Sequence, residues 1–153
     1  MKNRLSELPD CFKKNLSRIV VTDTDLLSAK ANEVLSDLKG SYLEQLKKDI
    51  PIMEDLLKKA HLVPLKERFD LIRNRFFVKV HDMKGQGATF GYPLLSFLGA
   101  YACDYVRDKE TITLSDVKVL ERIFKDIRLV FSESLLGDGG QKGEKIRKRW
   151  RTP

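Results

Sequence analysis

The sequence is poor in cysteine and has no long hydrophobic run. Its two cysteines, Cys11 and Cys103, stand far apart, which argues against a disulfide framework or a cysteine-rich metal site and favours free thiols. No segment approaches the roughly 18 consecutive apolar residues of a membrane span, and no apolar stretch follows the N-terminal residues as it would in a signal peptide. We therefore expect a cytoplasmic protein without a membrane span.

The sequence also lacks the alternation of apolar and polar residues that is typical of β-strands. Its 153 residues, 42% of them hydrophobic and 33% charged, suit one globular domain. Apolar residues instead recur every three or four positions, which is the pattern of amphipathic helices. The four apolar stripes are Leu27, Ala31, Leu35, Leu38, Tyr42, Leu46, Ile50, Met53 and Leu57; Phe69, Ile72, Phe76, Val80, Met83, Gly87 and Phe90; Leu94, Leu98, Tyr101 and Tyr105; and Val117, Leu120, Phe124, Ile127 and Phe131.

Capping and breaking residues set the ends of the first two helices. Asp23-Thr24-Asp25 can cap the first helix, and Pro51 within it should kink the helix rather than split it, because the apolar stripe keeps its phase. The second helix begins after an interruption at residues 61–64. It should end at Gly91, since glycine favours the left-handed C-terminal conformation and Pro93 suits the first turn of the next helix.

Two further local signals concern helix ends. His61 follows the first helix, where a polar side chain can bond to the last carbonyl groups, so we expect a structural role for it. The fourth helix can be capped either by Thr113 together with Asp116 or by Ser115. We expect that helix to end before the glycine-rich turn at residues 137–140.

Together these segments predict an all-α protein, an antiparallel four-helix bundle over residues 24–136. Residues 1–23 are expected to form an N-terminal arm, in which Pro9 argues against one continuous helix. Residues 137–153 form a basic C-terminal tail with six bases and two acids, a balance of +4 out of the net charge of +7. More than half of the excess positive charge therefore lies in the tail.

One histidine lies in a part of the second helix that contains glycine. The apolar residues between Val80 and Gly91 keep a helical period, although each glycine inside a helix costs about 1 kcal/mol relative to alanine. On a helix, His81 neighbours Phe77, Lys84 and Gly85 at spacings of three and four residues. This patch lies beside the apolar stripe, so we expect the imidazole to be accessible to a partner.

The chemistry of this patch suits an anionic group. Histidine is mostly neutral at pH 7, so that one ring nitrogen has a free lone pair and can act as a nucleophile. A phosphoryl group bound there would carry about −1.5 to −2 charges, which Lys84 could stabilise. Gly85, Gly87 and Ala88 add little bulk, so a partner could approach closely, and Phe77 is either an exposed docking contact or one more core residue. These features predict phosphoryl transfer between proteins, which depends mainly on positioning and charge stabilisation.

The motif His81-x-x-Lys84-Gly85, with Gly91 ten positions after the histidine, resembles the signature of histidine-containing phosphotransfer (HPt) domains of bacterial phosphorelays. The run from His81 to Pro93 is most similar to stand-alone HPt proteins of alphaproteobacterial type. The similarity extends over about residues 30–140. It implies a four-helix bundle, which the apolar periodicity predicts independently.

The resemblance also implies roles for the residues of the motif. His81 would accept a phosphoryl group from the aspartate of a receiver domain and pass it to another receiver, Lys84 would stabilise the phosphoryl oxygens, and Gly85 would allow docking. The partners would be receiver domains of response regulators or hybrid histidine kinases, which would carry Mg²⁺, whereas no cofactor or metal is expected in this chain. Because the sequence contains neither an ATP-binding kinase segment nor a receiver fold, we expect a monomeric phosphotransfer intermediate without kinase activity of its own.

The sequence leaves open which residue orients the imidazole ring. Many HPt domains place an amide or an acid on the following helix, where it forms a hydrogen bond with the histidine. By spacing, that position falls at Cys103, or at Asp104 if the turn differs by one residue. Gln86 or Asp82 could substitute from the histidine's own helix.

Two other functions remain open from the sequence. The first is a helical interaction module that binds receiver domains without transferring phosphate. The second is a nucleic-acid-binding protein that acts through the basic tail, because clustered bases with Trp150 suit phosphate contacts and base stacking. Such tails are more often merely solvated, so we favour nucleic-acid binding less than phosphotransfer. The HPt resemblance also permits a short helix that packs back on the bundle, and the sequence does not decide between a solvated tail and this helix.

Overall fold

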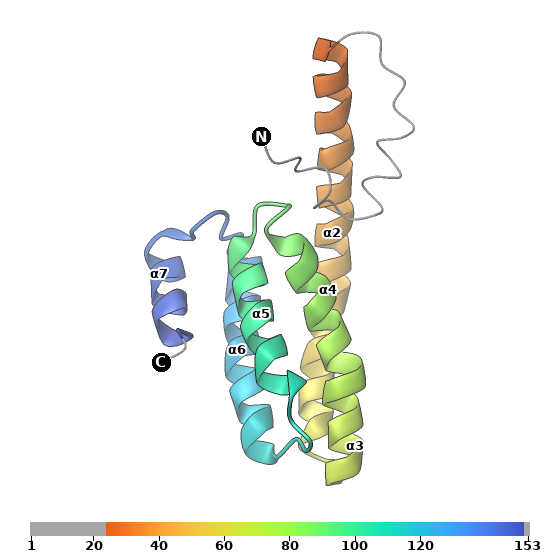
Figure 1. The fold of residues 1–153 in the computed structure, drawn as a ribbon, viewed down its shortest axis with the longest axis vertical. Helices are drawn as coiled ribbons and strands as arrows, with labels where there is room; N and C mark the ends of the chain where they lie inside the picture. The colour runs from red at the N-terminus through yellow and green to blue at the C-terminus, as the bar shows by residue number, and fades with distance from the viewer. Residues whose placement is uncertain (1–23, 152–153) are drawn as a thin grey trace. The chain divides into compact units, whose positions relative to one another are not determined.

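A computed structural model describes residues 24–151 (Figure 1). The expected N-terminal arm, residues 1–23, lies outside the described residues, as does Cys11. Every regular element in residues 24–151 is a helix, which confirms the all-α prediction, and none of these helices is both long and apolar enough to cross a bilayer. The described residues divide into two units between Gln45 and Leu46.

Helix α2, Thr24–Ala60, contributes to both units. It begins at the residues that the sequence indicates as a cap, and it continues through Pro51 without being split. Pro51 is exposed, so the carbonyl that loses its helical donor there can bond to water instead. In the second unit, the buried side chains of Leu46, Met53 and Leu57 place this face of α2 in the core.

The second predicted helix is observed as three consecutive segments without a break. They are α3 (Leu65–Asp70), a π-helical segment η2 (Leu71–Phe76) and α4 (Phe77–Gly87). The interruption before Leu65 agrees with the sequence, whereas the π-helical segment has no counterpart in the prediction. Most of the predicted stripe is buried: Ile72, Phe76, Val80, Met83, Gly87 and Phe90.

Helix α4 ends at Gly87, four residues before the predicted end, and a turn through Gly91 closes it, with a 2.8 Å hydrogen bond from the Tyr92 N–H to the Gly87 carbonyl. Helices α5 (Pro93–Arg107) and α6 (Leu114–Ser132) follow. Gly91 has φ = +90°, the left-handed conformation that glycine adopts without strain, and Pro93 stands in the first turn of α5. At α6, Thr113 is the N-cap and forms a capping box with Asp116, which selects it over Ser115. Helices α4 and α5 pack side by side, as do α5 and α6 (Figure 1).

The basic tail contains a helix, α7 (Gly140–Arg149), that packs against α6. Arg149 Nη1 donates hydrogen bonds of 2.6 and 2.8 Å to the two carboxylate oxygens of Asp126 on α6, and Trp150 Nε1 donates one of 2.6 Å to the same carboxylate. The indole is 5% exposed and its ring centroid lies 5.1 Å from that of Tyr101 on α5. Of the two possibilities that the sequence left open for the tail, the structure shows the helix that packs back, over residues 140–150.

Two polar side chains connect the helix ends of the second unit. The buried guanidinium of Arg68 donates hydrogen bonds to the carbonyl oxygens of Ala60 (2.8 Å), Val63 (3.0 Å) and Ile112 (3.4 Å), so it joins the end of α2 to the loop before α6. His61 Nε2 lies 2.8 Å from Glu121 Oε1 on α6. The histidine thus bonds to a side chain rather than to the helix-end carbonyls that we expected.

Candidate functional site

The residues of the predicted patch lie on one face of α4. His81 and Gly85 are exposed, whereas Phe77 and Lys84 are half-buried. The rings of Phe77 and His81 are stacked, with centroids 6.1 Å apart and planes inclined by 27°. Among the described residues, the imidazole has no hydrogen-bond partner and the Lys84 ammonium makes no ion pair. Both groups are therefore available to a ligand or a partner.

The two glycines of α4 have different surroundings. A Cβ placed on Gly85 would meet no atom within 4 Å, so this position is open to the exterior. A Cβ on Gly87 would lie 2.8 Å from Ser96 Oγ and 2.9 Å from the Tyr92 carbonyl oxygen. Gly87 is buried, and its missing side chain allows α5 to approach α4. Gly87 therefore faces α5 and does not provide the clearance for a partner that we expected. Ala88 is exposed, so its expected place in a docking surface stays a prediction.

Helix α5 supports the Lys84 end of the patch from behind. Ser96 Oγ donates a 2.8 Å hydrogen bond to the Lys84 carbonyl oxygen and accepts one of 2.8 Å from the backbone N–H of Ala88. A Cβ on Gly99 would lie only 2.7 Å from Lys84 Cβ, so glycine is needed where the two helices meet. The backbone that carries Lys84 is thus fixed by α5.

None of the four candidates for orienting the imidazole forms a hydrogen bond with it among the described residues. Cys103 is fully buried, and this burial raises the pKa of its thiol, although the positive charge of Lys84 opposes the shift. Asp104 is exposed and pairs with Arg107 at 2.8 Å. Gln86 is half-buried and Asp82 exposed, without a bond to the ring. If a contact among the described residues orients the imidazole, it comes from a residue other than these four.

Ser96 and Gly99 both support the site, but the sequence did not predict a role for either. For Gly99 a signal was present, because a glycine inside the apolar stretch of α5 is unfavourable for a helix and often marks a close approach between backbones. Ser96 gave no such signal, since a serine on a helix is usually solvated or bonded within its own turn. Its partners belong to the end of α4, which sequence spacing does not reveal.

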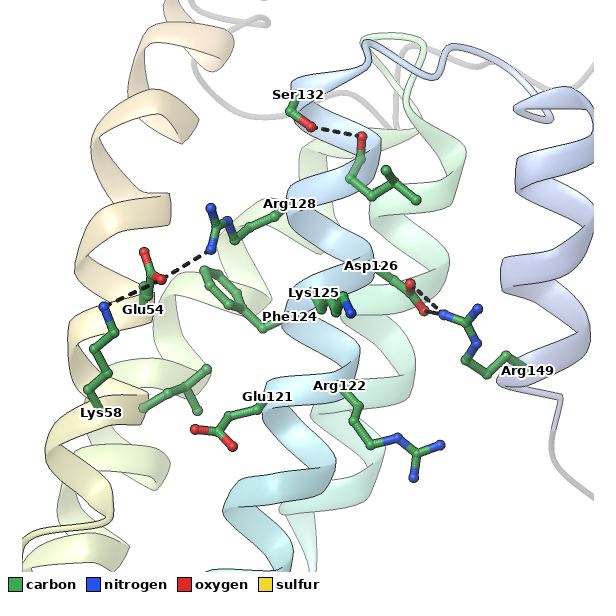
Figure 2. A pocket seen from close by; sticks show the side chains of 12 residues that line it. Glu54, Lys58, Glu121, Arg122, Phe124, Lys125, Asp126, Arg128, Ser132 and Arg149 are labelled. Atoms are coloured by element: carbon green, nitrogen blue, oxygen red, sulfur yellow. Dashed lines mark hydrogen bonds and ion pairs between the residues drawn. The ribbon is translucent and has the colours of Figure 1, made fainter.

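The grooves of the second unit lie away from this patch. An open groove of about 880 Å³ is lined by residues of α2, α6 and α7 (Figure 2). At its rim Glu54 Oε1 lies 3.1 Å from Arg128 Nη1 and 3.5 Å from Lys58 Nζ. Neither this groove nor the second one, beside the α2–α3 turn, includes a residue of α4. His81 is exposed on the surface of α4 and lines neither of these grooves, which suits a macromolecular partner better than a small molecule.

The described residues contain no cluster of three or more histidine, cysteine or acidic side chains that could hold a metal ion.

Comparisons of the chain with protein-family models, with curated proteins and with solved structures each gave no significant match. The geometry of the α4 surface and the motif itself are therefore the features that bear on function.

The contrast between the two glycines predicts opposite effects on stability. We expect Gly85→Ala to raise the free energy of unfolding by about 0.5–1 kcal/mol, because the helix gains an alanine in open space. Gly87→Ala should lower it by about 1–3 kcal/mol, because the new methyl group overlaps Ser96 and the Tyr92 backbone. Urea unfolding followed by circular dichroism would measure both; equal effects would contradict the assigned surroundings.

Proposed function

We propose that this protein is a phosphocarrier of the HPt type, which accepts a phosphoryl group on His81 from a receiver-domain aspartate and passes it to another receiver. The observation that supports this most is an exposed imidazole that has no hydrogen bond to the described residues, followed one turn later by a lysine without an ion pair among them and by an open glycine. In this proposal, the second half of α2, the α3–α4 rod, α5 and α6 form the four-helix bundle of that family. The carrier acts as a monomer in the cytoplasm, where its receivers are found.

The proposed step is an in-line displacement at phosphorus. The lone pair of one His81 ring nitrogen forms the P–N bond while the P–O bond to the receiver aspartate breaks, and the carboxylate leaves with the bonding electrons. The proton on the other ring nitrogen stays on the ring or passes to water. The receiver supplies Mg²⁺, and no cofactor of this chain takes part. The second transfer reverses these events on another receiver.

Lys84 and Gly85 have separate roles in this proposal. The half-buried stem of Lys84 rests against Gly99 of α5, which leaves the ammonium group free to reach phosphoryl oxygens, and charge-assisted hydrogen bonds to such oxygens are the stronger kind. Gly85 offers no side chain on the turn that follows His81. A receiver can therefore bring its phosphoaspartate close to the imidazole without displacing protein atoms.

The proposal is tested by incubating the purified protein with a receiver domain that carries a radiolabelled phosphoryl group. We expect label on this protein that is stable in base and lost in acid, as is typical of phosphohistidine. A receiver that binds tightly while no label is transferred would support the alternative, an interaction module without phosphotransfer. Retention on DNA or RNA without label would favour a nucleic-acid-binding function.

Replacement of Lys84 should slow transfer without unfolding the protein. We expect Lys84→Ala to lower the transfer rate about tenfold, which corresponds to the loss of one charge-assisted contact of about 1.4 kcal/mol in the transition state. Rapid-quench kinetics with the labelled receiver would measure it. The control is Lys118→Ala, which removes an exposed lysine of α6. If both variants transfer at the wild-type rate, Lys84 has no part in the reaction.

A further inference from the structure

The orientation of the His81 ring depends on an aromatic contact. No hydrogen bond reaches the imidazole within residues 24–151, and its one ring contact there is with Phe77, one turn earlier on α4. With 27° between the planes, the two rings are nearly parallel. Stacking engages the face of the imidazole, and no hydrogen bond from the described residues occupies either ring nitrogen at its edge. A hydrogen bond would instead occupy one nitrogen.

Phe77 is itself contacted by a residue four positions earlier in the chain. The guanidinium of Arg73 lies over the phenyl ring, 5.2 Å from its centroid, at the distance of a cation–π contact. Arg73 Nη1 also donates a 3.3 Å hydrogen bond to the carbonyl oxygen of Val106, near the end of α5. Arg73, Phe77 and His81 are spaced four residues apart and form a column along one helix face, anchored at one end to a second helix.

The backbone changes its geometry at this column. The π-helical segment η2 contains Arg73 and ends directly before Phe77, whose backbone N–H bonds to the Ile72 carbonyl. Short π-helical segments inside α-helices are rare and occur frequently at functional sites. The π-helical segment therefore carries Arg73 and directly precedes Phe77, the two residues that support the His81 ring.

We infer that Phe77 is the positioning residue for His81, and that Arg73 fixes Phe77 in the position needed for stacking. The inference rests on the proposed function and explains how the imidazole is oriented without a bond from Cys103, Asp104, Gln86 or Asp82. Because no hydrogen bond from the described residues occupies either ring nitrogen, the stacking can hold the ring while one nitrogen gains and later loses the phosphoryl group. Phe77 acts through His81 and does not touch the phosphoryl group.

The experiment compares three variants with the wild type by nuclear magnetic resonance of the histidine ring protons and by transfer kinetics. Phe77→Leu removes the ring and keeps an apolar side chain, Phe77→Tyr keeps the ring, and Arg73→Met removes the guanidinium. The matched control is Arg75→Met, on the exposed side of the same segment. Two histidines are present, and the His81→Gln variant assigns their signals.

We expect Phe77→Leu to shift the His81 ring signals, because the aromatic ring current is lost, and to lower kcat for transfer about tenfold while KM stays within about twofold. Phe77→Tyr should restore both values, and Arg73→Met should shift the signals by a smaller amount. Arg75→Met should resemble the wild type. A melting curve for each variant verifies that it is folded.

Two results would overturn the inference. Unchanged His81 signals in Phe77→Leu would show that the rings are not stacked in solution. A rise in KM with unchanged kcat would make Phe77 a docking contact instead. Failure of the proposed function has a different outcome, since the wild type would then take no label from any receiver while the ring signals still respond to Phe77→Leu.

Discussion

We expect the substitution His81→Gln to abolish phosphoryl transfer and to leave the fold unchanged. His81 is exposed and makes no hydrogen bond within the described residues, so the free energy of unfolding should change by less than about 0.5 kcal/mol. Glutamine is polar and of similar length, but the lone pair of its amide nitrogen is delocalised and is not nucleophilic. The rate should therefore fall by at least about 1,000-fold, to the background of the assay.

The matched control for this substitution is His61→Gln, because these two positions hold both histidines of the chain. His61 bonds to Glu121 on α6, so its replacement should cost a little stability and leave transfer intact. Labelling from a phosphorylated receiver, followed by acid and base treatment, measures both variants. Persistence of acid-labile label at the wild-type level in His81→Gln would exclude His81 as the acceptor.

Much of the helical structure could be predicted because its signals are local. Gly91 closes the turn after α4 and Pro93 starts α5 through their own backbone preferences, and Thr113 with Asp116 forms a cap within four residues. The π-helical segment η2 had no such signal. Arg68 could not be recognised as buried, because its three carbonyl acceptors come from Ala60, Val63 and Ile112, and the most distant of them is specified only by the folded chain.

Some features of the candidate site also follow from local spacing, whereas others depend on packing between helices. His81, Lys84 and Gly85 share a face because residues three and four positions apart on any helix are neighbours. The role of Gly87 could not be deduced from spacing, since the atoms that exclude a side chain there belong to Ser96 and Tyr92.

The support of the His81 ring depends equally on packing between helices. Sequence spacing predicted Cys103 or Asp104 as the residue that orients the imidazole. Cys103 is buried, however, and Asp104 pairs with Arg107. The contact that the structure shows comes from Phe77, for which the sequence left docking and burial open. Phe77 is half-buried, and the anchor that fixes it joins Arg73 to the end of α5, a contact that no local pattern encodes.

The basic tail shows how charge alone can mislead about partners. Its positive charge and its tryptophan suggested nucleic-acid binding, yet Arg149 and Trp150 are both engaged by Asp126. Asp126 is 3% exposed, and a buried carboxylate needs partners of this kind. The indole is therefore unavailable for stacking on bases, which weakens the nucleic-acid alternative.

We expect the substitution Asp126→Ala to detach α7 from the rest of the second unit. The carboxylate accepts hydrogen bonds from Arg149 and Trp150, and without it the buried indole N–H has no acceptor. An unsatisfied buried donor costs about 1–3 kcal/mol. The Arg149 side chain is 48% exposed and can bond to water instead, so loss of its ion pair adds less to the destabilisation. The free energy that holds α7 in place should therefore fall by about 2–4 kcal/mol.

Trp150 is the only tryptophan, so its fluorescence reports directly on this contact. In Asp126→Ala the emission should move to longer wavelength as the indole becomes hydrated, and trypsin should cleave the basic residues of α7 much faster than in the wild type. The control is Glu133→Ala, which removes the exposed partner of Lys142 at the same pair of helices and should cost at most about 1 kcal/mol. Unchanged emission in Asp126→Ala would mean that Ile146 and Gly143, which are also buried, hold α7 by packing alone.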